Sequence, residues 1–464
     1  MGGGSVAFCW AFKWRKMVVC MGLAFALLPK GACAQSLSDE LRDMIGSHPQ
    51  ISSKTKAVDS ATSAVDAAWS AYLPQVKLTA DTGPEYTDSV DRLNTQGKPF
   101  MRGTTHQSAM TVTQHLYDGS ATSAAVGQAR ATESVNQADL RSTRQNVLLE
   151  GSKAYLEVLR YTHLIRLALE NVHTVQDQLN LEDERISKGA GMSLDALTAK
   201  QQLQTAKEAR VRYDGKLRSA LATYMQVFGH APNVPEMIEP LAPLGLLSPT
   251  MEDAVDVAQK NNPSIESALH TITLQSERRR GAEAGYFPTL DLVGKSDFMH
   301  DKSASTGDRK DWSVLLQVSW DLFSGWKTQS QVAQYSSDHG AAMDSHRYTV
   351  RKTDELVRTK WEALTTAQES MGLLDNAATL AEEMVEATRK LHSAGKETIF
   401  NVLDSQNRLN DARIKYAESY YDMVEASFDV LNAMGQLELD AIDRSQGGAG
   451  GPSVRPPDFL SSRP

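Results

Sequence analysis

The second half of this chain repeats the first, and this repetition constrains the fold more than any other sequence feature. Short landmarks recur after 214 residues: His48-Pro49 as Asn262-Pro263, and Tyr72-Leu73-Pro74 as Tyr286-Phe287-Pro288. A later landmark recurs after 206 residues: Leu116-Tyr117-Asp118-Gly119 as Leu322-Phe323-Ser324-Gly325. Long internal repeats indicate arrays or pseudo-symmetric architectures. The sequence therefore predicts an internal duplication of strand–helix units.

The offsets divide the chain into five predicted parts. A first repeat spans 35–229, and a second repeat spans 251–437. Between them, residues 230–250 hold five prolines and predict an extended linker around the helical waist. The Gly- and Pro-rich end, 438–464, predicts a flexible C-terminal tail.

Residues 1–34 predict a secretory signal peptide. Lys13, Arg15 and Lys16 precede an apolar run of twelve residues that is too short to span a bilayer, and small residues follow. We expect cleavage after Ala34. Cys33 offers lipidation as an alternative, but Lys30 stands where a lipidation signal has an apolar residue.

Cysteine content and charge exclude several classes of protein. All three cysteines lie in the predicted leader, so the remainder has no disulfide framework and no cysteine nucleophile. The leader also holds four of the 48 Lys and Arg and none of the 57 Asp and Glu, so its removal changes the formal charge from −9 to −13. This acidic balance argues against nucleic acid as a partner.

The clearest strand pattern lies at 312–323. Apolar residues alternate with mostly polar ones from Trp312 to Phe323, which is typical of a half-buried strand. Trp312 and Trp320 lie eight residues apart, about 26 Å at ~3.3 Å per residue. That distance matches the apolar band of an outer-membrane barrel between its two aromatic girdles. A strand of a soluble sandwich would also alternate.

Three weaker strands are predicted at 76–87, 107–117 and 290–298, with polar loops at 88–104 and 299–310. Four strands cannot close a barrel, and open edges are not viable in lipid. The chain is therefore expected to share a barrel with copies of itself. Two copies give an interior that side chains fill, whereas three give twelve strands and a lumen. We predict a homotrimer.

Long helices account for most of the remaining chain. No proline occurs at 100–231 or 289–451, and a continuous helix over 119–188 would span about 105 Å. Residues 402–430 carry a heptad of Val402, Leu409, Tyr416, Met423 and Val430, which indicates coiled-coil packing. The first copy is less regular because Arg210 interrupts its apolar row. The predicted fold is a mixed α/β membrane protein whose barrel continues into an antiparallel α-helical tunnel.

These landmarks, with Ala154-Tyr155-Leu156-Glu157-Val158-Leu159 and the turns beginning at Gly189 and Gly395, resemble the TolC-like outer-membrane efflux channel family over residues 37–437. The resemblance implies a trimer in outer-membrane lipid with a periplasmic extension. It also implies docking to a periplasmic adaptor protein and an inner-membrane pump of the RND or ABC type. The implied function is passive export of drugs or proteins through an outer-membrane exit duct.

The resemblance also implies a periplasmic gate near the second turn. Acidic gate positions of the family correspond to Asn401 and Asp404 here, so one acid has become an amide. His392 and Glu397 stand where a tyrosine and an arginine are expected, and Asp195 matches the acidic partner from the first repeat. We expect a lock that differs in detail, with His392 facing a carboxylate. An ordinary acid near a helix N-terminus is the alternative for Asp195.

An enzyme has little support, since no HExxH, GxSxG or P-loop pattern occurs. No catalytic residue, metal site or cofactor is expected. A soluble periplasmic coiled-coil scaffold is the alternative function, which explains the heptads but not the tryptophan-bounded strand.

Overall fold

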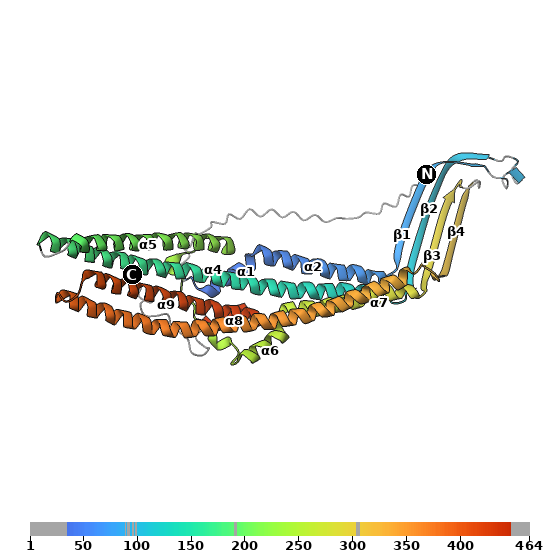
Figure 1. Ribbon diagram of the computed structural model, residues 1–464. Helices are drawn as coiled ribbons and strands as arrows, with labels where there is room; N and C mark the ends of the chain where they lie inside the picture. Colours follow the sequence, from blue (N-terminus) through green and yellow to red (C-terminus); the bar gives the residue numbers. More distant parts are fainter. Residues whose placement is uncertain are drawn as a thin grey trace.

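The computed structural model describes residues 35–446, apart from 89, 91–92, 95–96, 98–99, 190–192 and 303–306. The predicted signal peptide, Cys33 and residues 447–464 lie outside this range. The molecule is elongated: long helices run side by side, and a sheet extends from one end of them (Figure 1).

The first half begins with α1 (Leu37–Ser47), α2 (Pro49–Trp69) and the short η1 (Ser70–Tyr72). Strands β1 (Gln75–Asp88) and β2 (Phe100–Tyr117) follow, and then the long helices α4 (Ala121–Ser187) and α5 (Ser193–Phe228). His48 and Asn262 precede Pro49 and Pro263, which open α2 and α7 at a position where proline is tolerated.

The second half has the same order of elements. It comprises α6 (Met251–Asn261), α7 (Pro263–Glu283), η4 (Ala284–Tyr286), β3 (Thr289–His300), β4 (Asp308–Ser319), α8 (Lys327–Ser393) and α9 (Ile399–Ala433). Helices α4 and α8 each contain 67 residues, and α2 and α7 each contain 21. These matching lengths agree with the sequence offsets of 214 and 206.

The four strands form one antiparallel sheet in the order β1-β2-β3-β4. All four predicted strands are present, but two of them have wrong boundaries. Strand β2 begins at Phe100, within the loop predicted at 88–104, because its start pairs with the end of β1. The predicted start and end of β4 are also wrong. It begins at Asp308, within a predicted loop, and ends at Ser319, so Trp320 lies beyond the strand. Ser319 pairs with Thr289, and the preceding residue, Pro288, has no N–H with which to extend the ladder.

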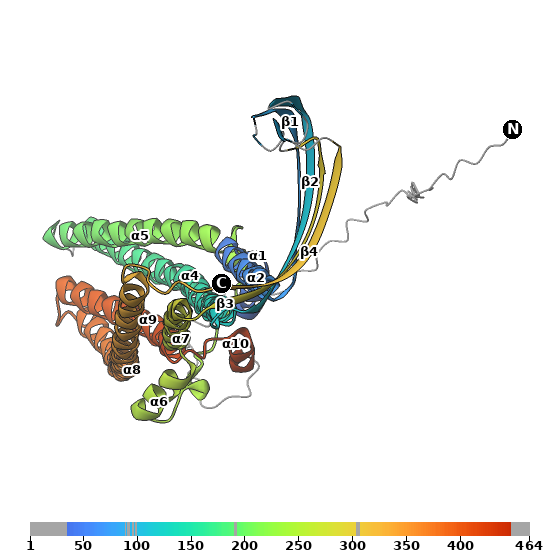
Figure 2. The ribbon, with the colours of Figure 1, turned by 90° about the vertical axis from the view of Figure 1, so that its right-hand side faces the viewer.

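The core lies at the waist, where the two helical hairpins meet. Figure 2 shows the α4–α5 pair beside the α8–α9 pair, with the curved sheet extending away from them. The fully buried aromatic side chains there are Tyr155, Tyr224, Tyr420, Tyr421 and Phe428. The predicted heptad from Val402 to Val430 is confirmed, since all five of its residues are buried, whereas Arg210 is exposed.

Two predictions about irregular segments need correction. The linker at 230–250 contains two short helices, η2 (Val234–Glu236) and η3 (Leu244–Leu246). The predicted flexible tail begins too early, because α10 (Leu439–Gln446) is a helix and Ile442 on it is fully buried. Among the described residues, no helix is long and apolar enough to cross a membrane.

Candidate functional site

Each long hairpin ends in a glycine-containing turn at the end of the molecule farthest from the sheet (Figure 1). Gly395 follows α8 with φ +71°. Its N–H donates to His392 O at 3.0 Å, and Lys396 N–H donates to Leu391 O at 2.9 Å. This is a Schellman motif, in which glycine adopts the left-handed conformation at little cost. We refer to this turn, and the turn after α4, as the tip.

His392 lies in a polar cluster that joins the two hairpins at the tip. Arg185 Nη1 donates to His392 Nε2 and, at 3.3 Å, to Glu182 Oε1. His392 Nδ1 donates to the backbone oxygen of Glu397 at 2.9 Å. Arginine can only donate and a carbonyl oxygen can only accept, so the two ring nitrogens of His392 have different roles in these contacts. His392 therefore connects α4 to the turn that precedes α9.

The predicted contact of His392 with a carboxylate is present, and the carboxylate is Glu182. The distance from His392 Nε2 to Glu182 Oε1 is 3.5 Å, and the Glu182 side chain is only 3% exposed. Sequence reasoning missed Glu182 and Arg185. The sequence contained a signal, since Ala168, Val175 and Glu182 are seven residues apart and Glu182 therefore continues an apolar heptad row of α4. All three side chains are buried.

The other predicted tip residues are only partly brought together. The side chain of Asn401 donates to Glu397 Oε1, and Asn401 N–H donates to Thr398 Oγ1, the N-cap of α9. Asp404 lies one turn further along and pairs with Arg408 Nε at 2.9 Å. Asp195 lies in the first turn of α5 and, within the described residues, makes no hydrogen bond or ion pair with the other four.

The sheet has two chemically different faces. Alternation and register place Val76, Leu78, Met110, Val112, Leu292, Val314, Leu316 and Val318 on one face. The opposite face is mostly polar, with Lys77, Thr79, Thr111, Thr113, Lys295, Ser313 and Gln317. Apolar residues such as Leu78 and Leu316, 72% and 62% exposed, are not covered by any other described part of the chain. This face requires an apolar environment.

Aromatic side chains gather where the sheet meets the helices. We define this junction belt as Trp69, Tyr72, Tyr117, Tyr286, Phe287, Trp320, Phe323 and Trp326, all exposed. Trp320 Nε1 donates to Tyr286 O at 3.1 Å, so its indole is fixed although it lies outside β4. Trp312, 83% exposed, lies at the far side of the apolar face. Rings with apolar bodies and polar atoms are typical of membrane–water interfaces.

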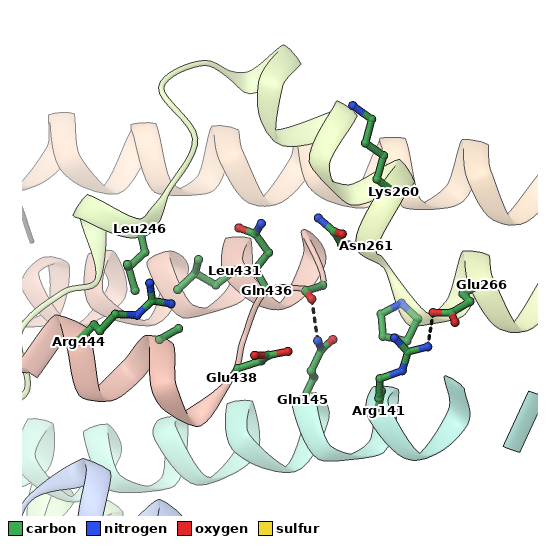
Figure 3. A pocket seen from close by; sticks show the side chains of 13 residues that line it. Arg141, Gln145, Leu246, Lys260, Asn261, Glu266, Leu431, Gln436, Glu438 and Arg444 are labelled. Atoms are coloured by element: carbon green, nitrogen blue, oxygen red, sulfur yellow. Dashed lines mark hydrogen bonds and ion pairs between the residues drawn. The ribbon is translucent and has the colours of Figure 1, made fainter. Parts of the chain in front are cut away.

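A polar cavity of about 490 Å³ lies at the waist, apart from the tip (Figure 3). Gln145 Nε2 on α4 donates to Gly435 O at 2.7 Å, and Arg141 pairs with Glu266 on α7. Its charged side chains carry both signs, and this hydrogen bond and ion pair join α4 to elements of the second half of the chain. These contacts give the cavity a structural role as a joint between elements.

The family model for outer membrane efflux proteins matches residues 41–230 and 254–436. Among curated relatives, the outer membrane efflux protein BepC of Brucella suis is 24% identical, over 90% of this chain and 89% of its own. The alkaline protease secretion protein AprF of Pseudomonas aeruginosa is also 24% identical, over 89% of this chain and 87% of its own.

Solved structures share the fold. A membrane protein from Pseudomonas aeruginosa superposes with a TM-score of 0.76 at 16% identity, covering 86% of this chain and 93% of its own. The two-segment family match covers most of the described residues, from α1 to the end of α9. The chain therefore belongs to the outer membrane efflux protein family.

Proposed function

We propose that three copies of this chain form the outer-membrane exit duct of a tripartite efflux or type I secretion system. The duct conducts its cargo passively from a periplasmic adaptor and an inner-membrane pump of the RND or ABC type to the exterior. The chain itself carries out no chemistry. One observation supports this most: a sheet with an apolar outer face and two open edges stands on helices far longer than a membrane is thick.

The open edges support the homotrimer. Among the described residues, strands β1 and β4 each have one partner strand, so one edge of each is unpaired there. In lipid, unpaired backbone groups cost several kcal/mol each, so every edge needs a partner strand. Pairing β1 of one copy with β4 of the next closes a twelve-strand barrel around the polar face. The apolar face then contacts lipid between Trp312 and the junction belt.

Exposed apolar rows on the helices support the same assembly. Leu373, Leu380, Met384 and Leu391 on α8 follow spacings of seven, four and seven, and all are exposed in the single chain. Leu197, Val211 and Met225 on α5 are fourteen residues apart and also exposed. Such spacing is typical of coiled-coil seams. We propose that α5 of one copy packs against α8 of its neighbour to form the tunnel wall.

The tip is the proposed gate and docking end. Asp404, with Asn401, Glu397 and His392, would form rings around the tunnel mouth in the trimer, and Asp195 would contribute from the first hairpin. Leu194 and Phe400, 70% and 57% exposed beside the two turns, offer apolar contacts for the adaptor. The proposed parts are two duplicated repeats, 35–229 and 251–437, joined by the waist segment 230–250.

The membrane placement is tested by a pair of adjacent substitutions. Leu316→Arg places a charge on the apolar face near its middle, where it costs about 2–4 kcal/mol, falling towards the interfaces. Gln317→Arg places the same charge on the polar face. We expect the first to lower the yield of folded trimer in outer-membrane fractions and the second to be tolerated. Equal yields would mean that this sheet does not face lipid.

Conduction and assembly are tested on the purified protein. Light scattering in detergent should return about three times the mass of the processed chain, and reconstitution in planar bilayers should give discrete conductance steps. A stable, folded monomer would overturn the shared barrel. A trimer without conductance, even after tip substitutions, would overturn the duct.

A further inference from the structure

The segment that joins the two repeats inserts a carboxylate between α4 and α9. Glu239 lies between η2 and η3, and its Oε2 is 3.8 Å from His163 Nδ1 on α4. Tyr421 on α9 hydrogen-bonds to the same carboxylate and lies 2.5 Å from His163 Nδ1 through its hydroxyl oxygen. The two side chains that flank Glu239 therefore come from different repeats.

The neighbouring backbone is held by a second tyrosine. Tyr155 Oη on α4 donates to the carbonyl oxygen of Ile238 at 2.7 Å and accepts the N–H of Ile238 at 2.9 Å. Ile238 N–H also donates to Gln35 O at 3.2 Å. The backbone at Ile238 is thus docked on α4 immediately before Glu239. We call Tyr155, His163, Glu239 and Tyr421 the waist latch.

The latch lies among other charged and titratable groups. They are Arg160 and Arg166 on α4, and Tyr420, Asp422 and Glu425 on α9. In addition, the negative charge of Glu40 on α1 raises the pKa of Tyr155. Glu239 Oε1 has no hydrogen-bond partner within the described residues, and neither has the buried hydroxyl of Tyr420. A buried carboxylate with an unsatisfied oxygen is costly when it is ionised.

Burial shifts the two titrating members of the latch in opposite directions. It raises the pKa of Glu239 to about 7, against the opposing effects of the Tyr421 hydrogen bond and Arg166. Burial, with Arg166, lowers the pKa of His163 to about 4. Both side chains are therefore uncharged in the docked state between these two values.

We propose that the waist latch is a proton-sensitive connection between the two repeats, which releases the 230–250 segment when Glu239 ionises. The protonated carboxyl stays between α4 and α9 and keeps the segment docked. The ionised carboxylate gains solvation by leaving, which exposes the seam between the two helices. The proposal depends on contacts within one chain and not on conduction or on the trimer.

The sign of the pH effect follows from proton binding. Glu239 keeps its proton when docked up to about pH 7, whereas an exposed glutamate loses it near 4.5, so docking weakens as pH rises through this window. His163 has the opposite effect. An exposed histidine binds a proton below about pH 6.5, whereas the docked His163 ring binds one only below about pH 4, so docking strengthens as pH rises through this window. The two windows overlap, so the opposing effects of Glu239 and His163 largely offset each other in the wild type, and a variant is needed to separate them.

Hydrogen exchange on the full-length protein in detergent isolates the contribution of Glu239. The readout is the opening constant of peptides covering 232–246, corrected for intrinsic exchange. We compare wild type with Glu239→Gln, so that the effect of His163 cancels in the ratio. The opening constant of wild type relative to the variant should increase roughly 25-fold between pH 5.5 and pH 8. A ratio that stays constant would overturn the proposal.

Two further variants keep the test decisive. Glu236→Gln removes a carboxylate three residues earlier in the same segment and should exchange like wild type at both pH values. His163→Gln removes the opposing effect of His163 and leaves Glu239 in place. The opening constant of this variant should therefore increase roughly 25-fold between pH 5.5 and pH 8. If Glu239→Gln does not fold, a flat profile for His163→Gln overturns the proposal by itself.

Discussion

Arg408 limits how strongly Asp404 can act at the tip. The two side chains pair along one face of α9 at 2.9 Å; Arg408 is exposed and Asp404 is half-buried. In the proposed trimer, the acidic ring is therefore accompanied by a ring of arginines. Rings of Asp select for cations, and neighbouring positive charges oppose this effect.

Substitutions at this pair should change ion selectivity in opposite directions. Arg408→Gln should increase the preference for cations, and Asp404→Asn should decrease it, as measured by reversal potentials in planar bilayers under a salt gradient. Asn401→Asp should add charge one turn away and strengthen the preference. If Asp404→Asn left the reversal potential unchanged, Asp404 would be an ordinary surface carboxylate.

The cluster at the tip should respond to loss of its arginine. Arg185→Ala leaves the buried Glu182 carboxylate without its cation, which typically costs about 3 kcal/mol. Hydrogen exchange of the turn after α4 should therefore accelerate at pH 8.

A matched control is available three residues further along the same helix. Lys188→Ala removes an ion pair with Glu184, but both side chains are exposed, and such pairs contribute about 0–1 kcal/mol. Its exchange at pH 8 should match wild type. Acceleration of equal size in the two variants would show that helix fraying, and not the cluster, controls the tip.

Sequence reasoning identified some of these residues and not others. His392, Glu397, Asn401 and Asp404 were located through the family resemblance, and the structure places all four at or near the second turn. Arg185 and His392 are 207 residues apart, on helices of different repeats. Heptad patterns define the apolar face of each helix, but they do not specify which helices meet or which charge is enclosed.

At the scale of elements, the turn after α9 tolerates only glycine. Gly435 has φ +73°, and a Cβ there would lie 2.6 Å from Asn261 O and 2.8 Å from Asn262 Cα. Gly435→Ala therefore combines an unfavourable conformation, about 1–2 kcal/mol, with a backbone clash. We expect a clearly lower melting temperature of the purified protein by calorimetry.

Gly215 provides the opposite case. It lies inside α5, and a Cβ there would have no atom within 4 Å. Gly215→Ala should stabilise the helix by about 0.5–1 kcal/mol and raise the melting temperature slightly. If the melting temperature decreased by a similar amount in both variants, the close approach of Gly435 to α6 and α7 would not explain why glycine is required there.

The strands were predictable in number and pattern but not in length. Alternation marks only the part of a strand with one apolar face, so the polar start of β4 at Asp308 was assigned to a loop. Pairing with β3 extends the ladder there, since Asp308 is opposite His300. At the other end, Pro288 stops the ladder before Trp320. The register between β3 and β4 determines both boundaries, and the alternation pattern of one strand gives no information about that register.

At the scale of the whole molecule, the long helices, their repetition and a segment around the waist followed from the sequence, but the contacts made at the waist did not. A run of prolines at 230–250 predicts an extended linker. The burial of Glu239 between α4 and α9 depends on where the two repeats meet. Helix α10 was also missed, because its short sequence has no periodic apolar pattern long enough to predict a helix. Contacts between repeats are tertiary, so local propensity does not reveal them.

The unpaired edges of β1 and β4 have a genetic consequence. In the proposed closed ring of three, each chain supplies one edge to each neighbour, so a defective chain that still pairs its strands would enter mixed rings. With equal expression and random mixing, only about one eighth of the rings would contain wild-type chains alone. An allele that blocks the tip but leaves the sheet intact should therefore act dominantly, whereas an allele that prevents strand pairing should be recessive.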